Sequence, residues 1–269
     1  MEFVTSGVAV VTGAGSGIGR ALAQQLAAAG SALAIADIDE KGLTETAALL
    51  TSKKAAVSTH VLDVSNEEAV RSFAEDVTTR HGRVTLLINN AGVALIGTFE
   101  EISLDDLRWL MGINFWGVVY GVKYFLPILK QQPRAHIVNL SSLFGIIAPV
   151  GQSAYSASKF AVRGFTEVIR HELEGTSVSV SCVHPGGIHT PIAKRARLGA
   201  NAPGNKHEEA IARFEQLTPT SPEAAAARIL KGVERREPRI LIGRDARQID
   251  IVQRLRPATY WKMMAKRAQ

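Results

Sequence analysis

Two residues in the second half of the chain have side chains and a spacing that could do chemistry. Tyr155 and Lys159 stand four residues apart, so on a helix they would share one face. An ordinary tyrosine, with a pKa of about 10, is too weak an acid to serve as a base near neutral pH. A lysine ammonium at about 4 Å, at an effective dielectric constant of about 20, would stabilise the phenolate by about 4 kcal/mol, or about 3 pKa units. The pair therefore indicates proton transfer to or from an oxygen, although a half-buried tyrosine beside a surface lysine would show the same spacing.

A glycine-rich turn lies much earlier in the chain, between a predicted strand and a predicted helix, and reads Thr12-Gly13-Ala14-Gly15-Ser16-Gly17-Ile18-Gly19. Its glycines at positions 13, 17 and 19 allow a tight turn and let the backbone approach a phosphate closely. The helix that follows would point its N-terminal amides and the positive end of its dipole at a pyrophosphate. The turn therefore predicts dinucleotide binding, and together with the Tyr–Lys pair it indicates an oxidoreductase.

An acidic residue, Asp37, ends the second predicted strand 18 residues after Gly19. A carboxylate at this place can accept hydrogen bonds from the adenosine ribose hydroxyls, and it would repel a 2′-phosphate. Arg20 is nearby, but it belongs to the following helix and is interpreted as a solvated surface residue. The sequence therefore favours NAD over NADP. A role for Asp37 as the cap of a helix that begins near Glu40 stays open.

Two further polar motifs follow predicted strands and would lie at the same edge of a sheet. Asp63, after the third strand, could accept a hydrogen bond from an adenine amino group, or could cap the helix that begins near Glu67. The run Asn89-Asn90-Ala91-Gly92, after the fourth strand, has small residues that would let a cofactor pass close to the backbone. Its second asparagine could bridge neighbouring strands.

Hydroxyl and amide groups near the middle of the chain could complete a catalytic site. Ser141 and Ser142 end the fifth predicted strand, where a hydroxyl could stabilise charge that develops on a substrate oxygen. Asn114 lies within an apolar helical pattern, Leu107–Leu129, where a buried amide needs a hydrogen-bond partner. It is either a functional group or a satisfied core amide.

Short apolar runs alternate with helix-length segments along most of the chain. The predicted strands are Val8–Thr12, Ala32–Ile38, Ala56–Leu62, Val84–Asn89, His136–Leu140, Val178–Val183 and Arg239–Ile242. The predicted helices are Gly17–Ala29, Glu40–Ser52, Glu67–His81, Ser103–Lys130, Tyr155–Glu174 and Pro222–Arg236. Gly30 and Gly82 are expected C-caps, and Ser221 before Pro222 is an expected N-cap. The alternation predicts an α/β fold in one domain, a doubly wound parallel sheet of about seven strands with helices on both faces.

Composition and charge exclude several classes of protein. No run of eighteen apolar residues is present, so no membrane-spanning helix is expected, and the first strand begins too early for a signal peptide. A cytoplasmic location is therefore expected. Cys182 is the one cysteine and is expected to be a small buried apolar residue. Of the net charge of +6, residues 244–269 carry +5, so the basic character belongs to a tail and does not predict nucleic-acid binding.

Two segments depart from the regular alternation. Residues 191–220, after the sixth strand, would lie over the carboxyl edge of the sheet, either as a mobile substrate lid or as a surface loop with a short helix. Residues 244–269 form a basic, amphipathic extension, with apolar residues at Ile249, Val252 and Leu255 and an aromatic Trp261. We expect this extension to dock on the domain or on a neighbouring subunit. An anionic membrane surface is the less favoured alternative.

These motifs together resemble the short-chain dehydrogenase/reductase family over residues 5–243. Thr12-Gly13-(x)3-Gly17-x-Gly19 is similar to its cofactor turn, Asn89-Asn90-Ala91-Gly92 to its adenine-side motif, and Pro185-Gly186-(x)3-Thr190 to the motif after its sixth strand. The catalytic tetrad of the family corresponds to Asn114, Ser142, Tyr155 and Lys159, and the 13-residue spacing before Tyr155 selects Ser142 over Ser141. The residues expected to bind cofactor are Gly13, Ser16, Gly17, Ile18, Gly19, Asp37, Asp63, Val64, Asn90, Ala91, Tyr155, Lys159, Pro185, Gly186, Ile188 and Thr190. No metal site is expected.

The resemblance also implies a mechanism. Tyr155 would take the hydroxyl proton of an alcohol while a hydride passes to NAD⁺, or return it in the reverse direction. Lys159 would lower the pKa of the tyrosine and hold the nicotinamide ribose, and Ser142 would polarise the substrate oxygen. Asn114 would organise a water that links Lys159 to solvent, and Ile188 and Thr190 would bind the carboxamide.

The substrate is expected to be a small apolar alcohol or ketone, because the residues expected around it are apolar: Val93, Ala94, Leu95, Leu143, Phe144, Ile146, Val150 and Ile192. One alternative is a 3-oxoacyl-carrier reductase, which a basic patch of Lys194, Arg195 and Arg197 would support. The other is a non-enzymatic, cofactor-sensing protein on the same fold. A homodimer or homotetramer is expected from the resemblance.

Overall fold

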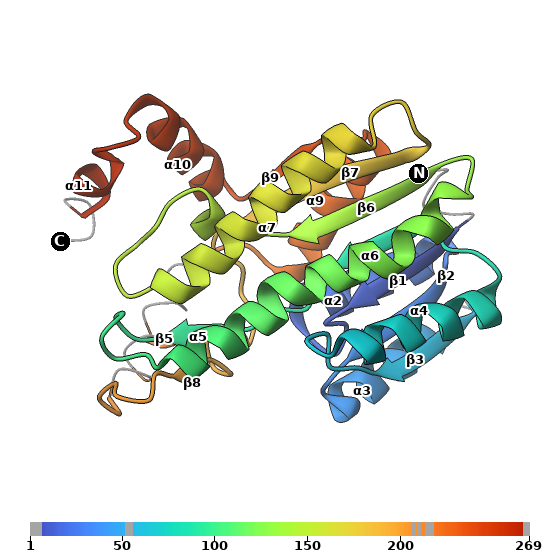
Figure 1. Cartoon of the computed structure of the whole chain (residues 1–269), viewed down its shortest axis with the longest axis horizontal. Coiled ribbons are helices and arrows are strands. Elements are labelled where there is room, and N and C mark those ends of the chain that lie inside the picture. Colours follow the sequence, from blue (N-terminus) through green and yellow to red (C-terminus); the bar gives the residue numbers. More distant parts are fainter. Residues whose placement is uncertain (1–6, 52–55, 206–207, 209–210, 213–217, 266–269) are drawn as a thin grey trace.

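The computed structural model describes residues 7–51, 56–205, 208, 211–212 and 218–265 (Figure 1). A seven-stranded sheet runs through its centre in the order β3-β2-β1-β4-β6-β7-β9, with every neighbouring pair parallel. The strands are β1 (Val8–Thr12), β2 (Ala32–Asp37), β3 (Val57–Val61), β4 (Leu86–Asn89), β6 (Ala135–Leu140), β7 (Val178–Pro185) and β9 (Arg239–Ile242). The predicted doubly wound fold is confirmed.

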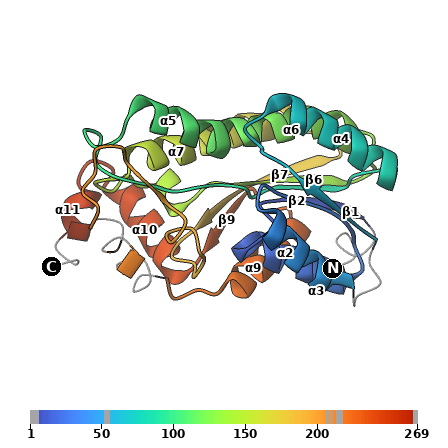
Figure 2. The ribbon, with the colours of Figure 1, turned by 90° about the horizontal axis from the view of Figure 1, so that it is seen from below.

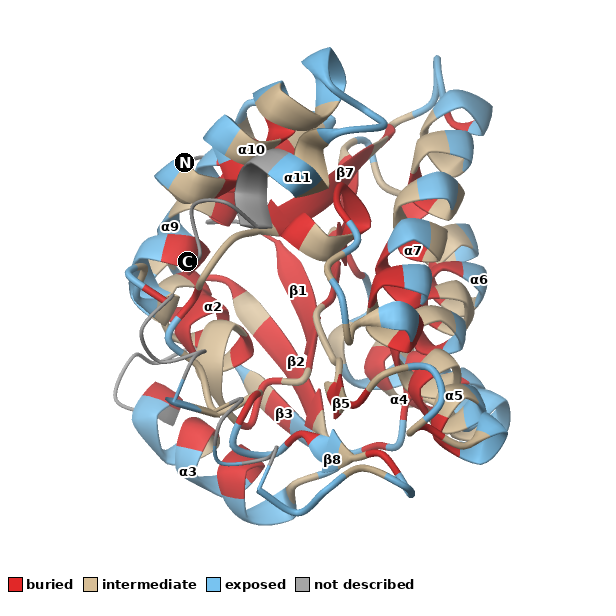
Figure 3. Cartoon of the chain, turned by 90° about the vertical axis from the view of Figure 1, so that its left-hand side faces the viewer, coloured by how far each residue is buried: buried red, intermediate tan, exposed pale blue. Residues whose placement is uncertain are grey.

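The central strands are apolar without alternation because both of their faces are covered. All residues of β1, β4 and β6 are buried. One face of the sheet packs on helices α2 (Gly17–Ala29), α3 (Glu40–Thr51) and α9 (Pro222–Glu234). The other packs on α4 (Glu67–His81), α6 (Gly117–Lys130) and α7 (Ser153–Glu172). Figure 2 shows these three layers, and Figure 3 shows the buried strands between them.

Local signals set the helix ends. Ser221 accepts a hydrogen bond from the Ala224 amide ahead of Pro222, as predicted. Gly30 and Gly82 end α2 and α4 with φ of 99° and 72°, conformations that side chains other than glycine rarely adopt. The two glycine caps end α2 and α4 a few residues before β2 and β4 begin, so these helices and the strands that follow them are joined by short loops.

The prediction of one continuous helix over Ser103–Lys130 is wrong. It is divided into α5 (Leu104–Met111), a π-helical segment η1 (Gly112–Trp116) and α6. Ser103 caps α5 and forms a reciprocal capping box with Asp106. The π-helical segment inserts an extra residue into the turn, and such segments often occur at functional sites. A helical repeat in the sequence carries no sign of this interruption.

The segment after β7 returns to its starting point. Ile188 bridges to Thr220, and the Thr220 amide donates to Gly187 O at 3.2 Å. Within the segment, β8 (Arg197–Leu198) pairs with β5 (Leu95–Ile96) in a small parallel sheet that the sequence did not predict. Of the predicted lid at 191–220, positions 206–207, 209–210 and 213–217 lie outside the described residues. The lid stays a prediction.

The C-terminal extension, as far as it is described, comprises α10 (Arg244–Leu255) and α11 (Tyr260–Ala265). Ala246 and Asp250 of α10 are buried, and Asp250 forms an ion pair with Arg239 of β9. The extension therefore packs on the chain's own sheet edge (Figure 1). Among the described helices, none combines the length and apolar character needed to cross a membrane.

Candidate functional site

The glycine-rich turn between β1 and α2 is closed tightly on itself. Gly13 and Gly17 have φ of 67° and 52°. A Cβ on Gly19 would lie 2.1 Å from Gly13 O, and one on Gly13 would lie 2.8 Å from Ala91 Cα. The turn therefore has no room for larger residues, while the N-cap Ser16 makes no side-chain capping bond. When a helix follows a turn of this kind, the backbone amides of its first turn can bind the pyrophosphate of a dinucleotide.

Thr12 and Asn90 fix this turn to the end of β4. Thr12 Oγ1 accepts hydrogen bonds from the Asn90 and Ala91 amides at 3.0 and 3.1 Å. Asn90 Nδ2 donates to the carbonyls of Thr12 and Gly13 at 2.9 and 3.0 Å. The predicted bridging by Asn90 is confirmed. The sequence does not single out Thr12 as a site residue, because its hydroxyl reaches residues 90 and 91 only once β1 and β4 pair.

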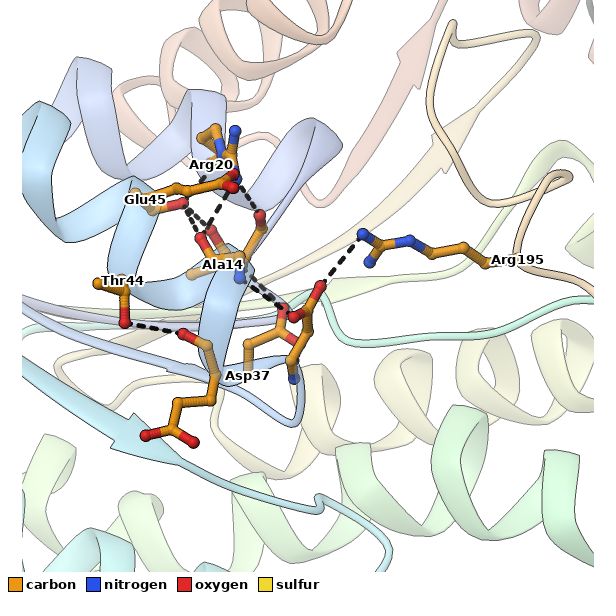
Figure 4. A network of polar contacts seen from close by, with 11 residues as sticks. Ala14, Arg20, Asp37, Thr44, Glu45 and Arg195 are labelled. Atoms are coloured by element: carbon orange, nitrogen blue, oxygen red, sulfur yellow. Dashed lines mark hydrogen bonds and ion pairs between the residues drawn. The ribbon is translucent and has the colours of Figure 1, made fainter.

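Asp37 faces the turn rather than capping a helix (Figure 4). Its Oδ2 accepts from the Gly15 amide at 2.7 Å, and its Oδ1 accepts from the Asp39 amide at 2.9 Å. A carboxylate has about four acceptor positions, so two remain for ribose hydroxyls. The side chain thus holds the turn and is placed for the predicted contact.

Arg20 is not a solvated residue, and the interpretation from sequence was wrong. Its guanidinium donates to Gly15 O at 2.5 Å, to Thr46 Oγ1 at 2.9 Å and to Glu45 at 2.9 Å (Figure 4). It also donates to Gly42 O at 3.2 Å. The bonds to Gly42, Glu45 and Thr46 tie α2 to α3. The sequence could not show them, because these three partners lie more than twenty residues from Arg20. The five donors of arginine suit such a bridge.

The two arginines of the predicted basic patch are paired with acidic residues of the same chain. Arg195 forms an ion pair with Asp39 at 3.1 Å, seen beside Asp37 in Figure 4. Arg197 pairs with Asp106 at 3.5 Å, and its guanidinium stacks 3.6 Å from the centre of the Trp109 ring. Both arginines link the segment after β7 to neighbouring elements. Neither presents an unpaired cation to an acidic carrier protein.

Asp63 and Val64 lie at the end of β3, next to the end of β2. The Leu62 amide donates to Asp37 O at 2.9 Å, which places the two strand ends side by side. Asp63 Oδ1 accepts from the Ser65 amide and hydroxyl at 2.9 and 2.7 Å, and Asn66 is the true cap of α4. Val64 is buried against Gly117. Asp63 is exposed beside the end of β2, whereas Val64 is part of the core, and the adenine contact expected of this pair stays a prediction.

Ser141 and Ser142 point to different sides of the end of β6. Ser141 is buried, and its hydroxyl donates to Lys159 O at 2.8 Å. Ser142 is half-buried and accepts a hydrogen bond from the Phe144 amide at 3.1 Å, at the start of a short 3₁₀ turn η2 (Leu143–Gly145). Its hydroxyl also lies close enough to Tyr155 to lower the pKa of the phenol. The structure therefore brings Ser142, and not Ser141, to the tyrosine.

Tyr155 and Lys159 share one face of α7, as their spacing predicts. Lys159 Nζ lies 5.7 Å from the centre of the Tyr155 ring and donates to Leu140 O at 3.1 Å. Burial lowers the pKa of the Lys159 ammonium to about 8. Burial also raises the pKa of the Tyr155 phenol, and the Ser142 hydroxyl opposes that rise. Ser142 is thus a group that lowers the phenol pKa in this arrangement. The expected lowering by Lys159 stays a prediction.

Asn114, in η1, is fully buried and has all the partners that its amide needs. Its Oδ1 accepts from the Val93 amide at 2.8 Å, and its Nδ2 donates to Val93 O and Ser158 Oγ at 3.0 and 3.2 Å. Its Oδ1 and Lys159 Nζ both flank Gly92, at 3.2 and 3.4 Å from the position of a Cβ there. Asn114 therefore has the hydrogen bonds of a fully paired core amide, as one of the two alternatives expects. Its position near Lys159 is also compatible with the predicted proton path, which stays a prediction.

The motif after β7 reaches the glycine-rich turn. Thr190 Cγ2 would lie 3.1 Å from a Cβ on Gly17, so the two segments are in contact. Ile188 is buried in the core beneath them, and Pro185 and Gly186 continue from the last residues of β7. The glycine-rich turn and the segment from Pro185 to Thr190, both predicted to bind cofactor, thus lie next to each other at one edge of the sheet.

Some apolar residues predicted to line a substrate site belong to the core instead. Leu95, Leu143 and Ile146 are buried in packed clusters. Phe144 remains half-buried with its ring edge-on to Tyr155, at 6.0 Å between ring centres, and Val150 is 74% exposed. The immediate surroundings of the phenol are therefore aromatic and aliphatic.

A family model described as short chain dehydrogenase matches residues 7–201. The chain belongs to the short-chain dehydrogenase/reductase family. It is therefore an oxidoreductase of that family. A Mycobacterium tuberculosis protein described as an oxidoreductase, SadH, is 42% identical over 262 residues, covering 96% of this chain and 94% of the relative.

Solved structures of the family have the same architecture. A short-chain dehydrogenase/reductase from Burkholderia phymatum, in complex with NAD, is 33% identical with a TM-score of 0.88, and the match covers 95% of each chain. A short-chain dehydrogenase from Mycobacterium paratuberculosis, bound to NAD, is 26% identical with a TM-score of 0.79, covering 91% of this chain and 99% of the other. Most of the chain thus follows the fold of these solved structures.

Proposed function

We propose that this chain is an NAD(H)-dependent dehydrogenase/reductase that interconverts a secondary alcohol and a ketone on an apolar substrate. The observation that carries the proposal is the pairing of Ser142 with Tyr155, beside Lys159, at the sheet edge that also holds the glycine-rich turn. The NAD complexes of two structural relatives support the choice of cofactor. Asp37 supports NAD over NADP, because its carboxylate lies against the turn, where a 2′-phosphate would be repelled.

Each end of the cofactor would be held by its own residues. The Gly13–Gly19 turn and the start of α2 would take the pyrophosphate. Asp37 and Asp63 would take the adenosine, and the segment from Pro185 to Thr190 would take the nicotinamide carboxamide. Bound NAD⁺ supplies the hydride acceptor for the reaction.

The chain's own side chains would manage the proton. In oxidation, the Tyr155 phenolate accepts the hydroxyl proton of the alcohol while Ser142 donates a hydrogen bond to the same substrate oxygen. In reduction, the phenol returns the proton to that oxygen. Lys159 would relay the proton onward past Gly92 toward Asn114. Phe144 packs edge-on against the phenol ring, with 6.0 Å between the ring centres, and this contact would help to orient the ring.

A direct assay tests the proposal. Purified protein is mixed with NAD⁺ and a panel of apolar secondary alcohols, and with NADH and the matching ketones, while NADH absorbance is followed. We expect turnover with at least one apolar pair and weak turnover with carboxylate-bearing alcohols, because Arg195 and Arg197 are already paired with Asp39 and Asp106 and so are less available to a substrate carboxylate. Binding of NADH without any turnover would favour the cofactor-sensing alternative. Turnover confined to carrier-linked 3-oxoacyl groups with NADPH would favour the carrier reductase.

We also propose a homo-oligomer built on the outer faces of η1 and α7. Trp116, Phe160 and Val168 are exposed there by 48%, 39% and 55%, which is a cost that a second copy would remove. Light scattering at micromolar concentration would show the mass of a dimer or tetramer. A Val168→Glu variant would shift that mass toward the monomer, because the charge would have to be buried.

A further inference from the structure

The first contact of interest lies where α10 begins. Asp245 Oδ2 accepts a hydrogen bond from the Gly187 amide at 2.8 Å. A Cβ on Gly186 would lie 2.1 Å from Asp245 Oδ2, and a Cβ on Gly243 would lie 2.1 Å from Asp245 Oδ1. Both glycines therefore leave space that the carboxylate fills. The side chain is built into the segment after β7, the segment proposed to hold the nicotinamide end of the cofactor.

The second contact lies at the start of α11. Tyr260 Oη accepts a hydrogen bond from the Ala148 amide at 2.9 Å. Ala148 belongs to the loop between Ser142 and Tyr155, here called the substrate loop and defined as residues 143–151. Tyr260 also packs against the cluster that contains Leu143, Ile146 and Ile147, together with Ala246 and Ile249 of α10. The same cluster includes Phe144, whose ring contacts Tyr155.

The far end of the substrate loop has little else to hold it. Ala148 and Val150 are exposed, and Gly151 adopts φ of 75° with nothing within 4 Å of its Cβ position. A loop with few buried contacts depends strongly on each hydrogen bond that remains. The phenol of Tyr260 therefore has a larger effect on this loop than one hydrogen bond would have in a packed core.

We propose that the C-terminal extension forms part of the active site, with Asp245 as a positioning residue for the cofactor loop and Tyr260 as a positioning residue for the substrate loop. The assignment of one loop to the cofactor and the other to the substrate rests on the proposed function, whereas the contacts of Asp245 and Tyr260 do not. Tyr260 would hold the loop that closes on an apolar substrate, so it would set how well that substrate binds. Asp245 would set how well the nicotinamide end binds.

Amide hydrogen exchange tests the substrate-loop contact without cofactor or substrate. Tyr260→Phe removes the hydroxyl and keeps the ring. Tyr124→Phe is the matched control, because Tyr124 donates its phenol to Glu67 at 2.7 Å on the outer helix layer. We expect peptides covering 143–151 to exchange about two- to tenfold faster in Tyr260→Phe, the effect of one lost hydrogen bond, and unchanged in Tyr124→Phe.

Steady-state kinetics and NADH titration separate the two positions. Tyr260→Phe should raise the substrate KM about two- to tenfold, with the NADH Kd and kcat within twofold of wild type. Asp245→Ala should instead weaken NADH binding about tenfold or more, since it removes a charged acceptor from Gly187. Asp245→Asn keeps both the shape and an acceptor oxygen and should recover most of that loss, whereas Asp245→Leu, which has similar bulk but no acceptor for the Gly187 amide, should not.

Two results would overturn the inference. One is exchange over 143–151 that is the same in wild type, Tyr260→Phe and Tyr124→Phe. The other is an NADH Kd that is unaltered in a folded Asp245→Ala protein, with folding checked by thermal melting. A wild-type protein that turns over no alcohol or ketone would instead refute the proposed function, and the exchange and NADH-binding measurements would still decide the inference.

Discussion

At the scale of single residues, the reaction depends on one phenol that the fold makes reluctant to ionise. Burial raises the pKa of Tyr155, and the half-buried Ser142 is the nearby group that counters it. Lys159, with its pKa lowered to about 8, loses charge in mildly alkaline solution. Alcohol oxidation needs the phenolate and ketone reduction needs the phenol. Oxidation should therefore rise toward alkaline pH, and reduction should fall.

Tyr155→Phe should remove most turnover, by about a hundredfold or more, because a general base commonly contributes this much. NADH binding should change little, since the ring and its contact with Phe144 remain. Initial rates with a responsive substrate, with NADH fluorescence titration as the control for binding, would check this. Turnover within a few-fold of wild type would show that another group moves the proton.

Asp37 has two roles in the structure, and two substitutions separate them. Asp37→Ala should weaken NAD⁺ and shift the cofactor ratio toward NADP⁺ by about tenfold or more, since charged hydrogen bonds contribute about 1.5–3 kcal/mol. Asp37→Asn keeps an acceptor for the Gly15 amide and removes only the charge. It should relieve the repulsion of the 2′-phosphate with less damage to the turn. The kcat/KM values for both cofactors give the result, and a wild-type preference for NADP⁺ would contradict the assignment.

At the scale of secondary-structure elements, α10 and α11 determine what the basic tail is. The burial of Ala246 and Asp250 against the sheet edge favours docking on the domain over a membrane role. Two apolar side chains of α10, Ile251 and Leu255, nevertheless stay exposed by 57% and 74%. The extension is therefore a packed element with one apolar face open to solvent.

Deleting residues 245–269 should lower the melting temperature by about 5 °C or more, because it exposes the cluster around Ile147 and leaves Arg239 without Asp250. Differential scanning calorimetry would measure this, with the exposed Arg256→Gln as a control. Intact protein should sediment little with vesicles. An unchanged melting temperature, together with strong and salt-sensitive sedimentation with anionic vesicles, would favour the membrane alternative.

At the scale of the whole molecule, two buried histidines couple stability to pH. Burial lowers the pKa of His136 to about 3 and that of His184 to about 4, against an ordinary value of about 6.5. His136 lies 2.7 Å from Ser181 Oγ, and His184 Nδ1 lies 3.0 Å from Ser142 O. The unfolded chain thus binds more protons than the folded one between these values.

The sign of the effect follows from that difference. The neutral histidines stabilise the fold fully above pH 6.5, and their contribution falls as the pH drops through the window toward 3 to 4. The melting temperature should therefore decrease steadily below pH 6.5. His136→Gln should flatten that decrease, whereas the exposed His171→Gln should not. A melting temperature that is constant from pH 7 to pH 4.5 would contradict the role of these histidines.

The sequence by itself determined the features that depend on local chemistry. The strand–helix alternation, the caps at Gly30, Gly82 and Ser221, and the tight turn at Gly13–Gly19 follow from backbone preferences within a few residues. The same holds for the shared face of Tyr155 and Lys159, because residues four apart lie on one face of any helix. The resemblance added the choice of Ser142, and the orientation of the two serines agrees with it.

Only the tertiary structure decided the features that join distant segments. Arg20 bridges two helices, Asp245 reaches Gly187 across 58 residues, and Tyr260 reaches Ala148 across 112 residues. The π-helical segment around Asn114 and the ion pairs of Arg195 and Arg197 belong to the same class. No spacing in the chain announces these contacts, because they depend on how packed layers bring side chains together and which polar partners remain once water is excluded.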